Sequence, residues 1–194
     1  MTFFSIPHRR GKEKFSRENF SCEGRAMIAP TLQTERLTLR MPVIADFEYR
    51  ANFYVSERSV WEDGPLDRHQ AWRVWASEVG QWPLLGFGPF SVEDSQTQHY
   101  LGEVGIYQPD GYPEPELGWF TVPHAEGKGI AFEAARAVMR WSRATFGWDR
   151  LVNYIDPQNA RSIALAIRLG GVSADLPGSS PTDVVLAHDL RGLK

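Results

Sequence analysis

Two glycines separated by one residue stand in a turn between an expected strand and an expected long helix. The turn, H-A-E-G-K-G at residues 124–129, follows a strand expected at residues 116–122 and leads into a helix that begins at Ile130. Gly127 and Gly129 permit backbone conformations that a Cβ disfavours and allow close approach to a ligand. The free N–H groups of a helix's first turn, and the positive end of its dipole, point the same way. The pattern predicts a cradle for a phosphate group; a tight strand-to-helix turn without a ligand fits this segment equally well.

Two other phosphate-binding patterns are excluded by the residues of this turn. A P-loop requires G-x-x-x-x-G-K-[ST], but Lys128 is followed by Gly129 and not by serine or threonine. A dinucleotide-binding fingerprint requires a third glycine, and Phe132 occupies that position. The turn therefore predicts a cradle of a different type.

A second group of polar residues opens another expected helix. The segment D-P-Q-N-A-R-S at residues 156–162 follows a short apolar strand. Asn159 is a typical N-cap for a helix over residues 159–169, which two consecutive glycines terminate. Because residues 163–167 are apolar on every side, we expect this helix to be largely buried.

The periodicity of the remaining sequence predicts one domain of mixed α/β class. Strands are expected where apolar and polar residues alternate, and helices where apolar residues recur every three or four positions. The expected strands are residues 34–41, 86–93, 100–107, 116–122, 151–155 and 182–190. The expected helices are residues 46–54, 67–79 with Asp67 as N-cap, 130–146 and 159–169.

Composition excludes several classes of protein. The chain has 194 residues, of which 42% are hydrophobic and 23% charged, as in a soluble globular protein of one domain. A net charge of -3 argues against nucleic acid as the main partner. No apolar run approaches the roughly 20 residues that span a bilayer. The single cysteine, Cys22, cannot form an internal disulfide. We therefore expect a cytoplasmic protein without a nucleic-acid or membrane partner.

The first residues differ in composition from the rest of the chain. Residues 1–26 are basic, contain few apolar residues and show no clear period. We expect residues 1–29 to form a poorly ordered extension and residues 30–194 to form the folded domain. A basic arm that binds a partner is the alternative.

Taken together, the motifs resemble the GNAT superfamily of acetyl-CoA-dependent N-acetyltransferases. Residues 124–129 resemble its R/Q-x-x-G-x-G/A phosphate-binding motif, with His124 where Arg or Gln is usual. T-E-R-L-T-L-R at residues 34–40 and D-P-Q-N-A-R-S at residues 156–162 resemble elements of the RimJ/RimL-like branch, the ribosomal-protein-alanine N-acetyltransferases. The resemblance covers about residues 30–190, and its elements occur in the expected order.

The resemblance implies a single GNAT-type domain and a mode of cofactor binding. Its central, mostly antiparallel sheet would be splayed between the fourth and fifth strands and flanked by about four helices. The pantetheine arm of acetyl-CoA would enter this gap as a pseudo-strand, and no metal is implied. The expected backbone contacts to the arm come from Phe120, Thr121 and Val122. Those to the pyrophosphate come from the amides of Gly127, Lys128, Gly129, Ile130 and Ala131.

The resemblance also implies transfer of the acetyl group to a primary amine by direct attack in a ternary complex. Glu116 is the first choice of general base and Glu103 the second; a water chain without a dedicated base is a further option, and a solvent-facing strand residue is the plain alternative. Ser162 is the candidate acid toward the departing thiolate, because residues 159–171 contain no tyrosine. Asn159 and Ser162 would also contact the cofactor; helix capping and packing are the alternatives.

The acceptor is expected beside the first two helices. Trp61, Glu62 and Asp63 combine an aromatic ring with acidic groups that suit an ammonium ion. Trp72 and Trp75 lie nearby, but their spacing fits a helical core better. The acceptor would be a small-molecule amine or a peptide N-terminus, and a homodimer is one possible assembly. Two other classes of function remain open: an acetyl-CoA-binding module without catalysis, and a scaffold without a ligand.

Overall fold

The computed structural model describes residues 29–62 and 64–193. The extension predicted at residues 1–29 lies outside these ranges except for Ala29, which is buried in the core. Within the described ranges, no helix has both the length and the apolar character needed to cross a membrane.

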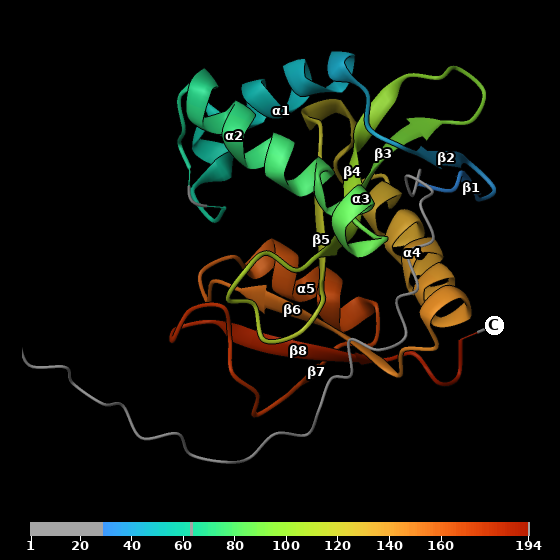
Figure 1. Ribbon diagram of the computed structural model, residues 1–194, viewed down its shortest axis with the longest axis vertical. Coiled ribbons are helices and arrows are strands. Elements are labelled where there is room, and N and C mark those ends of the chain that lie inside the picture. Colours follow the sequence, from blue (N-terminus) through green and yellow to red (C-terminus); the bar gives the residue numbers. More distant parts are fainter. Residues whose placement is uncertain (1–28, 63, 194) are drawn as a thin grey trace, which may run out of the picture.

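An eight-stranded sheet runs through the domain in the order β1-β2-β3-β4-β5-β6-β8-β7 (Figure 1). All neighbouring strands are antiparallel except β5 and β6, which are parallel. The strands are β1 (Leu32–Gln33), β2 (Leu37–Arg40), β3 (Pro89–Asp94), β4 (Tyr100–Tyr107), β5 (Glu116–Thr121), β6 (Arg150–Ile155), β7 (Val172–Ser173) and β8 (Val184–Asp189). The expected mixed α/β domain is confirmed, and the two-residue strands β1 and β7 were not predicted.

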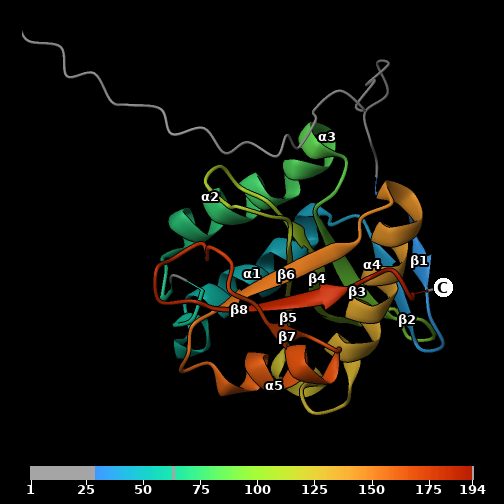
Figure 2. The ribbon, with the colours of Figure 1, turned by 90° about the horizontal axis from the view of Figure 1, so that it is seen from below.

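Five α-helices flank the sheet: α1 (Phe47–Tyr54), α2 (Arg68–Val79), α3 (Gln81–Leu85), α4 (Ile130–Phe146) and α5 (Ala160–Arg168). Helices α1 and α2 pack together, α4 packs on β2, β4 and β5, and α5 packs on β6. Figure 2 shows α2 and α5 on opposite sides of β6 and β8. The short helices η2 (Ile44–Asp46), η3 (Glu57–Ser59) and η4 (Pro123–Ala125) complete the connections. Only α3 was not predicted among the α-helices.

Helix α2 begins and packs largely as expected. The Asp67 carboxylate accepts a hydrogen bond from Gln70 N at 2.8 Å, so the predicted N-cap is confirmed. Trp75 is buried, whereas Trp72 is 40% exposed and contacts Phe47 edge-on. Only one of the two tryptophans therefore belongs to the core.

The expectation that α5 is largely buried is wrong. Within this helix only Ala166 is buried, and Ile167 is 57% exposed. Helix α5 covers the small half of the sheet, where it packs through Ala166 and Ile163 against Ile155. A single helix on one sheet face buries one side only, so a run that is apolar on all sides leaves part of itself exposed.

The T-E-R-L-T-L-R segment joins β2 to the starts of two helices. Arg40 forms a bidentate pair with Asp46, at 2.7 and 2.9 Å, just before α1 begins. Arg36 donates from Nε to Glu133 in the first turn of α4 at 2.7 Å, and from Nη1 to the Lys128 carbonyl at 3.2 Å. The motif therefore fixes the position of α4, and of the glycine turn before it, relative to the sheet.

Strands β5 and β6 diverge almost at once. They form one bridge, Glu116 with Val152, and Val152 N donates to the Pro115 carbonyl. This splayed pair, predicted for the fourth and fifth strands, is the fifth and sixth because β1 precedes them. Asn153 Nδ2 donates to the Leu117 carbonyl where the strands begin to separate.

The Asn153 side chain is itself held from β8. His188 Nε2 lies 2.5 Å from Asn153 Oδ1, and both residues are buried. Burial lowers the pKa of His188 to about 4, so the ring is neutral at pH 7. Because an amide oxygen can only accept, Nε2 must carry the ring proton and donate it. The chain from His188 through Asn153 to Leu117 therefore stabilises the point where β5 and β6 part.

Asn153→Ala should destabilise the fold strongly. The change leaves the Leu117 carbonyl and His188 Nε2 buried without their partner, and it opens a small cavity. We expect the free energy of unfolding to fall by about 2–4 kcal/mol in urea titrations. Tyr154→Phe is the control, because it removes a half-buried hydroxyl that accepts only from Glu114 N, and should cost about 1 kcal/mol or less. Equal losses in the two variants would show that Asn153 does not hold the strands.

Candidate active site

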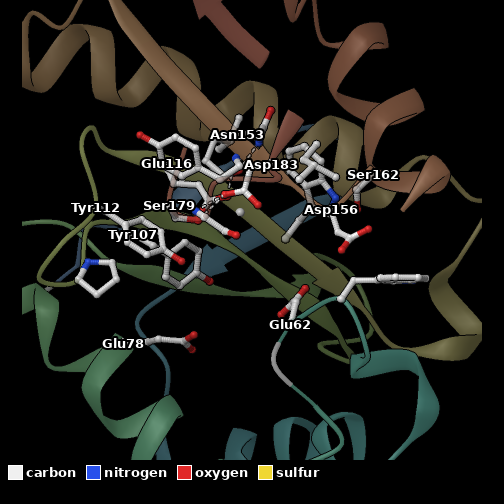
Figure 3. Close-up of a pocket in the computed structure, with 18 of the residues that line it drawn as sticks. Glu62, Glu78, Tyr107, Tyr112, Glu116, Asn153, Asp156, Ser162, Ser179 and Asp183 are labelled. Carbon is white, nitrogen blue, oxygen red and sulfur yellow. Dashed lines mark hydrogen bonds between the residues drawn. The ribbon is translucent and has the colours of Figure 1, made fainter. Parts of the chain in front are cut away.

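A pocket of about 640 Å³ lies where β5 and β6 separate (Figure 3). One wall comes from the segment before α2 and from α2 itself, and the other from β5, β6 and the loop before β8. The predicted residues that line it are Trp61, Glu62, Glu116, Asn159 and Ser162. Glu103 and Trp72 do not line it, and Asp63 lies outside the described residues.

Glu116 is the first residue of β5, and its carboxylate reaches the pocket. Glu116 Oε1 accepts a hydrogen bond from Tyr154 N at 3.0 Å, a group that the diverging strand no longer satisfies. Burial, together with the charges of Glu62, Asp183 and Glu78, raises the pKa of Glu116 to about 8, and the hydrogen bond from Tyr154 N opposes the rise. A carboxyl group with this pKa is mostly protonated at pH 7 and becomes available as a base as the pH rises through about 8.

Glu103, on β4, is fully buried. Its carboxylate accepts from Trp75 Nε1 at 3.3 Å and from the Tyr107 hydroxyl at 3.4 Å, and lies 3.6 Å from Arg50 Nε. Burial raises its pKa to about 7, while the adjacent Arg50 opposes the rise. Because these neighbours enclose Glu103, the geometry favours Glu116 over Glu103 as a group that can meet a ligand.

Arg50 on α1 is a pocket residue that sequence reasoning missed. Its guanidinium is 3% exposed and pairs with Glu78 at 2.7 Å and with Glu62 at 3.7 Å. It also donates to the Tyr54 hydroxyl at 2.9 Å. One feature of the sequence could have indicated its role: Arg50 lies among apolar residues on one face of a short helix. A cation buried there requires acidic partners from elsewhere in the chain.

The glycine turn has the geometry that a phosphate cradle requires. Gly127 and Gly129 adopt φ of 71° and 78°, in the left-handed region that favours glycine. A Cβ at Gly127 would meet no atom within 4 Å, so this side of the turn is open. No side chain caps α4, whereas Asp67 caps α2 and Asn159 caps α5. The first amides of α4 therefore remain available to an anion.

Two arginines that sequence reasoning missed lie beside this turn. Arg58, from η3, pairs with Glu126 and donates from Nη2 to the Thr121 carbonyl at 2.8 Å. Arg161, from α5, pairs with Glu126 at 2.7 Å. Glu126 thus holds one arginine from each side of the gap next to the glycine turn. Little in the sequence indicates that Arg58 and Arg161 belong to the site, because isolated exposed arginines are common on protein surfaces.

The backbone of β5 beyond the bridge faces two directions. Val122 N donates to the Leu101 carbonyl, and Phe120 pairs with Glu103 in the β4 register. Since the N–H and C=O groups of alternate residues point to opposite edges of a strand, Trp119 and Thr121 face the gap. Of the three residues predicted to hold a pantetheine arm, Thr121 is therefore the one best oriented for it.

The start of α5 carries two polar side chains into the pocket. Asn159 Oδ1 accepts from Ser162 N at 3.2 Å, which confirms the predicted N-cap. This bond uses the amide oxygen of Asn159 and the backbone of Ser162. Asn159 Nδ2 and Ser162 Oγ are the polar atoms that remain for a ligand.

Comparison with known proteins identifies the class to which this fold and site belong. Residues 36–172 match the family model of the acetyltransferase (GNAT) domain, well over half of the chain. The chain belongs to this GNAT acetyltransferase family, which uses acetyl-CoA as its acetyl donor.

Individual relatives agree with this assignment. The structure of an acetyltransferase from Agrobacterium tumefaciens is 36% identical, with a TM-score of 0.79 over 93% of this chain and 99% of that one. A GNAT-family acetyltransferase from Bacillus anthracis, 19% identical, shares the fold with a TM-score of 0.68 over 83% and 99% of the two chains. The uncharacterized Bacillus subtilis protein YkkB is 31% identical over 87 residues, which span 44% of this chain and only about half, 51%, of YkkB.

Glu116→Gln should make stability less sensitive to pH between about 4.5 and 8. The pKa of Glu116 is about 8 in the fold and near 4.5 when unfolded, so the folded state binds its proton more tightly. Its favourable contribution is complete below about pH 4.5 and is lost as the pH rises through about 8. Glutamine stays neutral and still accepts from Tyr154 N. Between these pH values the variant should gain on the order of 2 kcal/mol relative to wild type in urea unfolding, because partial exposure of the carboxylate reduces the full effect.

Glu48→Gln provides the control for this measurement. Glu48 is exposed and its pairing with Arg68 lowers its pKa, so it is ionised over the whole interval. The stability difference between this variant and wild type should stay constant above about pH 5. A constant difference for Glu116→Gln as well would mean that the Glu116 carboxylate titrates normally.

Proposed function

We propose that the protein transfers the acetyl group of acetyl-CoA to a primary amine by direct attack in a ternary complex. The observation that carries the proposal is one continuous arrangement. At one end of the gap between β5 and β6, beside the single bridge, the Glu116 carboxyl group has a raised pKa and reaches the pocket. At the other end, the glycine turn leads into α4, whose N-terminus no side chain caps. The motifs further favour the RimJ/RimL-like branch, through residues 34–40 and 156–162.

The residues present suit acetyl-CoA, which when bound supplies the acetyl thioester. The amides of Gly127, Lys128, Gly129, Ile130 and Ala131 would hold the pyrophosphate, supported by the α4 dipole. Thr121, with its neighbour Trp119, would hold the pantetheine arm, and Phe120 and Val122 would support that strand from the β4 side. Asn159 would add a hydrogen bond from Nδ2.

Glu116 and Ser162 would divide the proton transfers. Glu116 removes the proton that the amine must lose before attack, directly or through water. Ser162 donates toward the departing sulfur, with its orientation set by the first turn of α5. Glu103 acts as a positioning residue, because its carboxylate pairs with Arg50 and accepts a hydrogen bond from the Tyr107 hydroxyl.

Gly129→Val should abolish the binding of acetyl-CoA without unfolding the protein. A β-branched residue is strained at φ of 78° and crowds the backbone amides that would meet the pyrophosphate. Ligand specific to the folded state raises stability, by about 2.7 kcal/mol at a hundredfold excess over Kd. Thermal unfolding with and without acetyl-CoA measures this effect. Gly111→Val is the control, since Gly111 also has a positive φ but lies outside the cradle. A full thermal shift in folded Gly129→Val would place the cradle elsewhere.

Amine-dependent release of free CoA thiol tests the function itself. Because Glu116 must be ionised to act as a base, the ratio of kcat/KM between wild type and Glu116→Gln should increase with pH. We expect it to rise about tenfold per pH unit below about pH 8 and to be constant above it. Taking the ratio removes the ionisation of the amine, which affects both proteins equally. A ratio near one at all pH values would favour a water chain. Acetyl-CoA binding without thiol release for any amine would indicate a non-catalytic module.

A further inference from the structure

We propose that the acceptor is a compact amine with at least two ammonium groups, one that reacts and one or more that stay bound to the carboxylates of the pocket. This inference rests on the proposed function and names the substrate class of that site.

The pocket is strongly acidic. Six carboxylate side chains line it: Glu62, Glu78, Asp110, Glu116, Asp156 and Asp183. Among the described lining residues the only lysine or arginine is Arg50. A cavity lined by one sign of charge concentrates ligands of the opposite sign, and its low-dielectric walls strengthen the effect.

The carboxylates lie on both walls. Glu62 and Glu78 enter from the side of α2 and the segment before it, opposite Glu116 and Asp183 (Figure 3). An amine with a second ammonium, some carbon atoms from the reacting nitrogen, offers one positive charge to each wall.

Arg50 does not offer its charge to a ligand. Glu78, Glu62 and Glu103 already surround its guanidinium, at 2.7, 3.7 and 3.6 Å. Three carboxylates around one buried cation leave no net attraction for the carboxylate of an amino acid. The pocket therefore disfavours acceptors that carry a negative group close to the amine.

The acidic pocket is separate from the place where the cofactor phosphates would lie. That end of the gap carries Lys128, with Arg58 and Arg161 beside Glu126, and none of these lines the pocket. The separation assigns the positive end of the site to the phosphates and the negative end to the acceptor. Trp61 and Tyr112 on the pocket wall add aromatic faces that favour ammonium groups.

The size of the cavity favours a small molecule over a protein N-terminus. Its volume of about 640 Å³ is within the usual range of sites for small ligands. A protein terminus also brings one ammonium and then neutral backbone amides, so it would pair with fewer of these carboxylates than a polyamine would. Polyamines and aminoglycosides both carry several ammonium groups, and both therefore suit this pocket.

A matched series of acceptors tests the inference. Cadaverine, pentylamine and aminohexanoate share a reacting amine on a similar methylene chain, and end in a cationic, neutral and anionic group. We expect kcat/KM for thiol release to fall in that order, with cadaverine at least about tenfold above pentylamine, and the advantage to shrink in high salt. The same thiol-release assay is run with spermidine, kanamycin and a peptide with N-terminal alanine. These three acceptors distinguish a polyamine, an aminoglycoside and a protein N-terminus as the source of the amine.

Paired variants connect the preference to the pocket. Glu62→Gln with Asp110→Asn removes one lining carboxylate from each of two segments. The ratio of kcat/KM for cadaverine over pentylamine should fall about three- to tenfold. Glu35→Gln with Glu48→Gln removes the same charge from exposed positions outside the pocket, and should leave the ratio unchanged.

The outcomes separate this inference from the function on which it rests. Equal kcat/KM for all three linear amines, or an unchanged ratio in the Glu62 and Asp110 variant, would overturn the inference while acetyl transfer to amines stands. Preferential acetylation of the peptide would overturn it in favour of a macromolecular acceptor. Binding of acetyl-CoA without thiol release for any acceptor would overturn the proposed function as well.

Discussion

The separation of β5 from β6 after a single bridge is the constraint on which the rest of the site depends. Two strands that part leave backbone groups without partners, and buried groups of this kind are expensive. Near the bridge, Asn153 and Glu116 supply the missing partners from their side chains, and His188 holds Asn153 in place. Beyond Leu117, the Arg58 side chain still meets the Thr121 carbonyl, and the other backbone groups of Trp119 and Thr121 face the gap. The same divergence therefore creates both the opening for a cofactor arm and the special position of Glu116.

Electrostatics divides this gap into two ends. Arginines gather at the glycine turn, where Glu126 holds Arg58 and Arg161 beside the first amides of α4. Carboxylates gather at the other end, around one buried arginine that they already neutralise. A cofactor with phosphates would complement the first end of the gap, and a cationic amine acceptor would complement the second. The β2 motif contributes at a distance, because Arg36 binds the Lys128 carbonyl and so fixes the turn against the sheet.

Local patterns predicted most of the elements, the glycine turn and both caps, because each depends on residues close in sequence. Asp67 and Asn159 cap their helices through bonds that span three residues. Arg50 pairs with Glu78 and Glu103, 28 and 53 positions away, and Asn153 meets His188 only because β6 pairs with β8. Such contacts follow from sheet order, which one sequence does not reveal. The error on α5 has the same origin: its apolar run predicted burial, but how much is buried depends on how many elements surround the helix.

Glu103 and Glu116 show why a raised pKa alone does not identify a base. The two residues lie on adjacent strands, and burial raises the pKa of each, to about 7 and about 8. Glu103 is enclosed by Trp75, Tyr107 and Arg50 and does not line the pocket, so a ligand there does not meet its carboxylate, which pairs with Arg50. Glu116 forms the one bridge to β6, and the divergence that begins just beyond it opens its carboxylate to the pocket. Access, set by strand geometry, therefore decides which of two similar carboxylates can do chemistry.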